Sequence, residues 1–303
     1  MALSPLDRRA FLVLGATLLA GCTAAGKTEP TTSRSAAGGT TGTGGESPAS
    51  PPGSASPGPQ PRPRLPSVRR WHPSADDITP DAKLTAVQAV ERLGNHRGHA
   101  LQVLEAQYGG LLASTASVLT VCSSWRLVQG DVVAGGHTYD VRLSRGALGW
   151  HVTAIHPSRP GTTAPGLSRI ARRVLASDRI ELPPAARADV ESGQVHDATL
   201  EAMLRLSHTY RIRVSVVRSG HPQYVFGTDR LSDHPFGRAF DTWSINGRAV
   251  IDSGTPESLV TDYMRAAADV GSYNVGGPYL IGAAPQYFSD STHHDHVHAG
   301  FLP

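Results

Sequence analysis

A stretch of 48 residues near the N-terminus limits where this chain can form a folded core. Of residues 23–70, 31 are Gly, Ser, Thr or Pro, and only Leu65 and Val68 are large aliphatic residues. Such a segment cannot bury enough apolar surface to offset the entropy that is lost on ordering. We therefore expect residues 23–70 to be a disordered tether. The fold is expected in the roughly 230 residues that follow, which suffice for two modest cores.

The first 22 residues indicate export and a lipid anchor. Arg8 and Arg9 precede a short apolar run at residues 10–19, as in a secretory signal peptide. The letters DRRAFL resemble the twin-arginine export motif, and the general secretory route is the alternative. The letters LAGC resemble a bacterial lipobox, in which the cysteine is lipidated. We expect residues 1–22 to be a lipoprotein signal peptide, and Cys22 to anchor an extracytoplasmic protein to the bacterial cell membrane.

Composition excludes several other classes of protein. Cys22 and Cys122 are the only cysteines, so a multi-cysteine zinc module is excluded. No apolar run reaches the 18 or so residues that a membrane-spanning helix needs. The net charge is +3 without a basic run, so nucleic acid is not an expected partner.

Periodicity predicts an α+β fold with two folded segments, residues 71–160 and 166–303, separated by a Pro/Gly/Thr-rich stretch. In the first segment we expect helices at 80–93 and 100–108, followed by strands at 118–128, 137–143 and 150–155. The apolar face of the first helix is predicted to consist of Leu84, Val87, Val90 and Leu93. In the second segment we expect helices at 197–207 and 256–270, strands at 211–217 and 296–301, and a hairpin at 240–251 that turns at Asn246-Gly247.

Histidines concentrate near the C-terminus in two clusters. Residues 232–241 read SDHPFGRAFD, and residues 293–298 read HHDHVH. Imidazole and carboxylate groups suit zinc, which at a catalytic site takes about three protein ligands. His234 and Asp241 can converge if the chain turns at Gly237. His296 and His298 share one face of a strand, so one of them can complete a His-Asp-His site.

The first cluster carries a resemblance to a known family. SDHPFGRAFD fits the pattern SxHxxGxAxD, and with the later HxH it resembles the zinc D-alanyl-D-alanine carboxypeptidase and dipeptidase family. That family belongs with the lysostaphin-type peptidases and the hedgehog signalling domain, and the resemblance covers residues 167–301. It implies a small antiparallel sheet with flanking helices, and zinc bound by His234, Asp241 and His298.

The same resemblance implies roles for the neighbouring residues. His296 would stabilise the transition state and Asp295 would be the general base, which requires the chain to bend near His296. The family usually takes an arginine for the oxyanion from an SGYRS-like segment. Here Arg218 precedes the Ser-Gly pair instead of following it, and His221 or Arg238 could substitute for it. His293 and His294 are expected to flank the site.

The expected function is zinc-dependent hydrolysis of peptidoglycan stem peptides, by a D,D-carboxypeptidase or an endopeptidase. The main alternative is a non-catalytic zinc-stabilised module that binds the cell wall, which would not need the arginine. A weaker alternative is a 2-His-1-carboxylate iron oxygenase, because its ligand set is the same.

Overall fold

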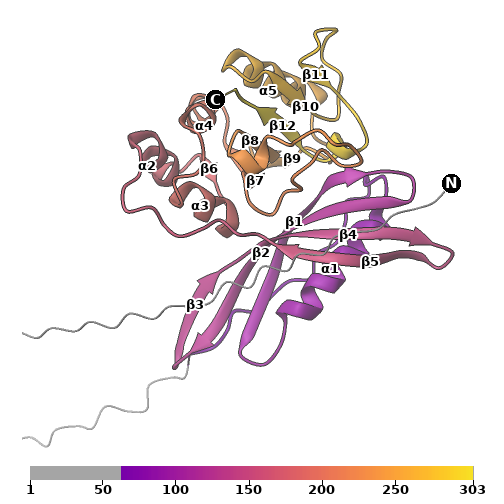
Figure 1. The fold of residues 1–303 in the computed structure, drawn as a ribbon, viewed down its shortest axis with the longest axis vertical. Coiled ribbons are helices and arrows are strands. Elements are labelled where there is room, and N and C mark those ends of the chain that lie inside the picture. The colour runs from indigo at the N-terminus through magenta and orange to yellow at the C-terminus, as the bar shows by residue number, and fades with distance from the viewer. Residues whose placement is uncertain (1–62, 303) are drawn as a thin grey trace, which may run out of the picture. The chain divides into compact units, whose positions relative to one another are not determined.

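The computed structural model describes residues 63–302 (Figure 1). Within the compact unit Pro59–Pro303 it has an α+β architecture with two separate sheets. The predicted signal peptide, the lipid anchor at Cys22 and most of the predicted tether lie outside the described residues. Between residues 63 and 302, no helix has the length and apolar character needed to cross a bilayer.

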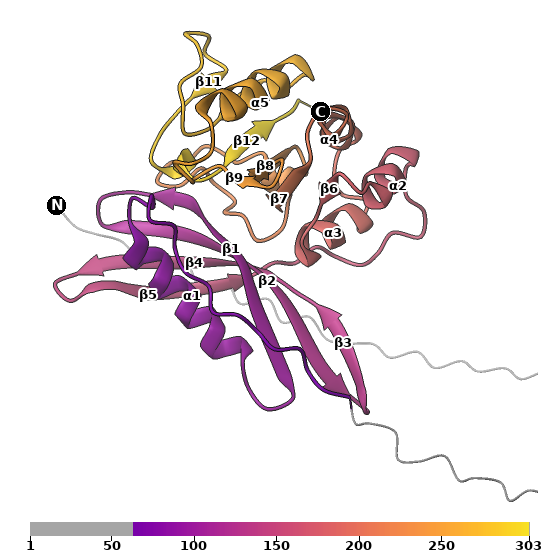
Figure 2. The ribbon, with the colours of Figure 1, turned by 180° about the vertical axis from the view of Figure 1, so that it is seen from behind.

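The first sheet is antiparallel, with the order β1-β2-β4-β5, and β3 pairs with the far end of β2. Its elements are α1 (Pro80–Gly94), β1 (His99–Leu111), β2 (Thr115–Val128), β3 (Asp131–Gly135), β4 (Thr138–Gly146) and β5 (Gly149–Pro157). Helix α1 begins with a proline in its first turn, where the missing N–H costs nothing, and lies across one face of this sheet (Figure 2).

The predicted helix at 80–93 and the three predicted strands are confirmed, but two details are wrong. The buried face of α1 includes Ala82, Lys83 and Ala86, whereas Leu93 is 57% exposed. The segment predicted as a helix at 100–108 is part of strand β1. The pairing of β1 with β2 shifts register between Val103 and Glu105. This irregularity breaks the strict alternation of buried residues, so the apolar spacing imitates a helix.

The second sheet has the order β11-β10-β12-β8-β7-β6, and β9 pairs with β8. Its strands are β6 (Ile180–Glu181), β7 (Ile212–Val216), β8 (Ala239–Ile245), β9 (Arg248–Ala249), β10 (Asn274–Gly276), β11 (Tyr287–Phe288) and β12 (Val297–Gly300). The β6–β7 and β10–β11 pairs are parallel, so the sheet is mixed and not wholly antiparallel as expected. The β8–β9 hairpin turns as predicted, with φ positive at Asn246 (52°) and Gly247 (79°).

Helices flank the second sheet and enclose its core. They are α2 (Arg169–Ala176), α3 (Pro184–Glu191), α4 (Asp197–Ser207) and α5 (Glu257–Asp269), of which α4 and α5 were predicted. Two short 3-10 helices, η1 (His234–Phe236) and η2 (Thr292–His294), precede β8 and β12. Phe240, Tyr263 and Met264 are completely buried in this core. The central strands β8 and β12 are almost wholly buried, and both histidine clusters adjoin them.

Candidate metal centre

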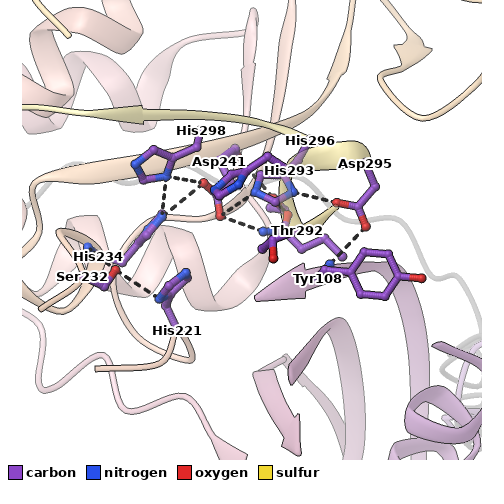
Figure 3. A network of polar contacts seen from close by, with 12 residues as sticks. Tyr108, His221, Ser232, His234, Asp241, Thr292, His293, Asp295, His296 and His298 are labelled. Atoms are coloured by element: carbon purple, nitrogen blue, oxygen red, sulfur yellow. Dashed lines mark hydrogen bonds and ion pairs between the residues drawn. The ribbon is translucent and has the colours of Figure 1, made fainter. Parts of the chain in front are cut away.

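Three side chains converge where η1, β8 and β12 meet (Figure 3). His234 Nε2 lies 3.1 Å from Asp241 Oδ1 and 3.1 Å from His298 Nδ1, and the last two atoms are 3.0 Å apart. Asp241 and His298 are directly opposite each other on the paired strands β8 and β12, so their side chains point to the same face. The structure thus brings together the three residues that the resemblance implies as metal ligands.

The turn that delivers His234 depends on Gly237. This glycine ends η1 in the left-handed region at φ 69°, and a Cβ atom there would lie 2.2 Å from the carbonyl oxygen of Gln194. Only glycine meets both demands. The seven-residue spacing between His234 and Asp241 therefore closes into one site, as predicted from the sequence.

The hydrogen bonds of His234 leave a lone pair directed at Asp241. Its Nδ1 lies 2.9 Å from the carbonyl oxygen of Val217, which can only accept, so Nδ1 carries the proton and Nε2 of the neutral ring does not. Nε2 and the ionised Asp241 Oδ1 are then two acceptors at 3.1 Å. A proton on Nε2 or a metal ion between the two atoms relieves this repulsion. Ligands of a tetrahedral zinc ion with bonds of about 2.0–2.1 Å lie roughly 3.3 Å apart, so the residues fit such an ion.

His221 offers a further donor that the ligand prediction did not include. One ligand atom each of His221, His234 and Asp241 lie within 4.8 Å of one another, so this group could also hold a metal ion. The His221 ring stacks on the His234 ring at 4.1 Å. His298 lies within 3.0–3.1 Å of both His234 and Asp241, so we take His298 and not His221 as their third partner. His221 lies next to this group of three.

The electrostatics favour the metal-binding protonation states. Burial lowers the pKa of His298 to about 4, and burial together with His234 holds the pKa of His221 well below its usual value. Burial opposes ionisation of Asp241, but the neighbouring His234 and His296 outweigh it and hold its pKa well below the usual range. Neutral imidazole and ionised carboxylate are the forms that coordinate metals.

Asp295, the predicted general base, is engaged by three other groups. The backbone bends at Asp295 (φ −109°, ψ 0°) as the resemblance requires. Its carboxylate lies 2.6 Å from Lys83 Nζ, accepts the Tyr108 N–H at 3.0 Å and lies 2.6 Å from His296 Nδ1. Burial would raise the pKa of Asp295, but the Lys83 ammonium and His296 lower it. Asp295 is 3% exposed, and the contact of its Oδ1 with Nδ1 orients the His296 ring.

His296 is placed as the resemblance implies, beside the candidate ligands. Its Nδ1 is held by Asp295, and its Nε2 lies 3.8 Å from Asp241 Oδ2. Burial lowers the pKa of His296, but Asp241 and Asp295 together raise it above its usual value. A protonated ring presents an N–H at Nε2, which is a cationic hydrogen-bond donor next to the site.

Arg218 lies elsewhere. Its guanidinium donates to Gln194 and to the Pro160 carbonyl at 3.3 Å, and lies 3.8 Å from Asp189 Oδ1. It lines a neighbouring cavity together with His156 and His221. Arg218 does not line the cavity that His234, His296 and His298 line, and its guanidinium contacts described above go to other groups.

A cavity of about 430 Å³ opens onto the candidate ligands. His234, His296 and His298 line it, as do Arg238 and His293. His293 Nδ1 lies 2.8 Å from Asp290 Oδ1, so this ring donates from Nδ1 and directs the lone pair of Nε2 away from Asp290. The sequence placed His293 only as a flanking residue, and its partner Asp290 was not singled out.

The first segment also contributes to the site, which sequence reasoning missed. Lys83 comes from α1, and Gln107 and Tyr108 come from β1. Gln107 Nε2 donates to Asp241 Oδ2 at 2.7 Å, and Lys83 pairs with both Asp295 and Asp77. A lysine on the buried side of a helix is the one sequence signal that could have indicated such a pair.

Comparison of the chain with protein-family models, with curated proteins and with solved structures gave no match in any of the three.

Proposed function

We propose that this protein is a zinc-dependent peptidase that hydrolyses peptidoglycan stem peptides at the bacterial cell surface. The observation that carries the proposal is the convergence of His234 Nε2, Asp241 Oδ1 and His298 Nδ1 within 3.0–3.1 Å of one another at the wall of a cavity. Three N/O ligands with an open side are typical of a catalytic zinc site. The substrate class follows from the family resemblance of residues 232–241, and the location follows from the predicted lipid anchor at Cys22.

Zinc held by these three residues would supply a Lewis acid that polarises a peptide carbonyl and makes water more acidic. The chain itself supplies the proton transfers. His293 Nε2 is the proton acceptor we favour, because His293 lines the cavity and Asp290 fixes its tautomer. Asp295 suits this role less well, since Lys83, Tyr108 and His296 already occupy its carboxylate.

His296 takes the part that the resemblance assigns to an arginine. Asp295 holds its Nδ1, which leaves the Nε2–H free to donate to the oxyanion that forms on the scissile carbonyl. The neighbouring carboxylates raise the pKa of His296 above its usual value, which favours a protonated ring that matches this oxyanion. The displacement of Arg218 then does not remove the cationic group from the site.

A non-catalytic zinc-stabilised cell-wall binding module is the second candidate. One observation favours it: the Arg218 guanidinium donates to Gln194 and to the Pro160 carbonyl and does not line the cavity at the candidate metal centre. A binding module does not need an oxyanion group. It would retain His234, Asp241 and His298 for stability alone.

The test combines metal analysis with peptide hydrolysis. The purified protein is analysed for bound metals and incubated with muropeptides, with zinc or with chelator, and masses are followed. Chelator-sensitive loss of one D-Ala indicates a carboxypeptidase, and conversion of cross-linked dimers to monomers indicates an endopeptidase. Zinc binding without any mass change supports the binding module. Iron in place of zinc, or no bound metal, contradicts the proposal.

Matched variants locate the activity. His298→Ala is expected to weaken zinc binding strongly and to abolish hydrolysis, whereas His151→Ala, at an exposed histidine of β5, should change neither. His293→Gln is expected to retain zinc and lower kcat by about 10²–10⁴-fold, as for loss of a general base. If His293→Gln keeps full activity and Asp295→Asn loses it with zinc still bound, Asp295 is the base after all.

A further inference from the structure

One polar side chain of the first sheet reaches a candidate metal ligand in the second. Gln107 on β1 is completely buried, and its Nε2 donates to Asp241 Oδ2 at 2.7 Å across a sequence separation of 134 residues. The Ser215 hydroxyl on β7 donates to Gln107 Oε1. A carboxylate can only accept, so the NH₂ group of Gln107 must face Asp241, and Oε1 is left to accept the Ser215 hydroxyl.

Because of this contact, the two carboxylate oxygens of Asp241 have different partners. Oδ2 accepts the Gln107 N–H, while Oδ1 faces His234 and His298 at 3.1 and 3.0 Å. A carboxylate without such a partner rotates between one-oxygen and two-oxygen coordination. Hydrogen bonds to a metal-ligating side chain orient it and typically change metal affinity by about 10–100-fold.

We infer that Gln107 is a positioning residue for the metal centre, and that the first folded segment serves to complete that centre. The inference rests on the metal-binding half of the proposed function and is independent of the peptidase activity. Gln107 lies well before residues 167–301, so it is outside the region that the resemblance covers. The strand that carries it is fixed by pairing with β2 along nearly its whole length, which makes it a rigid support for the amide.

The direct test measures zinc affinity by competition with a chromogenic chelator, using the full chain. Gln107→Met keeps the length and burial of the side chain but removes the donor. It is expected to weaken zinc binding by about 10–100-fold. Gln102→Met, on the same strand, removes an amide of a half-buried side chain that bonds to the Arg69 backbone, and it should stay within about twofold of the unmodified protein. The absorption spectrum of the cobalt-loaded protein is expected to change for Gln107→Met and not for Gln102→Met.

Ser215→Ala provides an arm that leaves Gln107 in place. Without the serine hydroxyl the buried Gln107 Oε1 loses its hydrogen-bond donor and the amide is held only by Asp241, so a loss of zinc affinity at the lower end of the range of about 10–100-fold is expected. If Gln107→Met fails to fold, the zinc affinity of Ser215→Ala tests the inference in its place. Unchanged zinc affinity in Gln107→Met, or in Ser215→Ala where the first variant does not fold, overturns the inference while the proposed function stands. If the unmodified protein binds no zinc, the proposed function fails and the inference fails with it.

Discussion

Replacing Lys83 with methionine tests whether the two sheets are joined by a buried charge network. Lys83 Nζ lies 2.8 Å from Asp77 Oδ2 and 2.6 Å from Asp295 Oδ2, and its side chain is 1% exposed. Burial disfavours the Lys83 ammonium, but Asp295 and Asp77 raise its pKa above the usual value. The lysine is therefore charged, and its removal leaves two buried carboxylates without their cation.

The expected cost follows from what the two carboxylates retain. Removal of one partner from a buried ion pair costs about 3–5 kcal/mol. Asp77 keeps hydrogen bonds from the Tyr108 hydroxyl and the Thr79 N–H, and Asp295 keeps the Tyr108 N–H and His296. These donors hold the cost near the middle of that range, so we expect Lys83→Met to lower the free energy of unfolding by about 4 kcal/mol. Domains of this kind are stable by about 5–15 kcal/mol, so the variant should fold but melt early.

The assay is urea denaturation in chelator, so that metal binding does not contribute. Adding Asp295→Asn to Lys83→Met removes one unpaired charge and should recover about 1–2 kcal/mol. Arg265→Met is the control, because its pair with Asp262 is exposed and should contribute less than about 1 kcal/mol. A cost below about 1 kcal/mol for Lys83→Met, or no recovery in the double variant, would refute the network.

Two further predictions concern single positions in the same region. Burial raises the pKa of Glu105 from 4.5 to about 7. Between these pH values the folded state holds a proton that the unfolded chain releases, so stability falls as the pH rises from 4.5 to about 7. Glu105→Gln should leave stability unchanged near pH 4 and raise it by about 1–3 kcal/mol at pH 8 in thermal melts, and an equal effect at both pH values would contradict this. Gly237→Ala should cost more than about 2 kcal/mol in denaturant and also weaken zinc binding, because φ is 69° and the new Cβ meets a backbone oxygen at 2.2 Å. Gly247→Ala is the control for φ alone, since nothing lies within 4 Å there, and an equal cost at both glycines would show that the contact does not matter.

The convergence of His234, Asp241 and His298 could be predicted from the sequence because much of its geometry is local. The spacing of His234, Gly237 and Asp241 describes one turn leading into one strand, and the alternation of His296 and His298 describes one strand face. The structure adds that β8 and β12 are neighbours, which places Asp241 opposite His298. Such a pairing is a common outcome when two short strands share a small sheet.

The contribution of the first segment could not be predicted in the same way. Gln107 and its partner are 134 residues apart, and no local pattern connects them. The register shift in β1 makes its apolar spacing resemble that of a helix. The face of the strand on which the Gln107 side chain lies therefore could not be predicted from the sequence. Lys83 sits among apolar residues of α1, and its burial is explained only by Asp295, which comes from the far end of the chain.

The carboxylates explain why a site of this kind needs both sheets. Asp241 would have to be ionised to bind a metal, and an ionised Asp295 favours the protonated form of His296. Both carboxylates are nonetheless buried, at 1% and 3% exposure. A buried anion is stable only when hydrogen bonds and opposite charges replace its water. On the second sheet, histidines engage one oxygen of each carboxylate. The other oxygen is satisfied by the first segment, through Gln107 of β1 for Asp241, and through Lys83 of α1 and the Tyr108 N–H of β1 for Asp295. Both segments therefore contribute groups to the proposed site, although the sequence motif lies in only one of them.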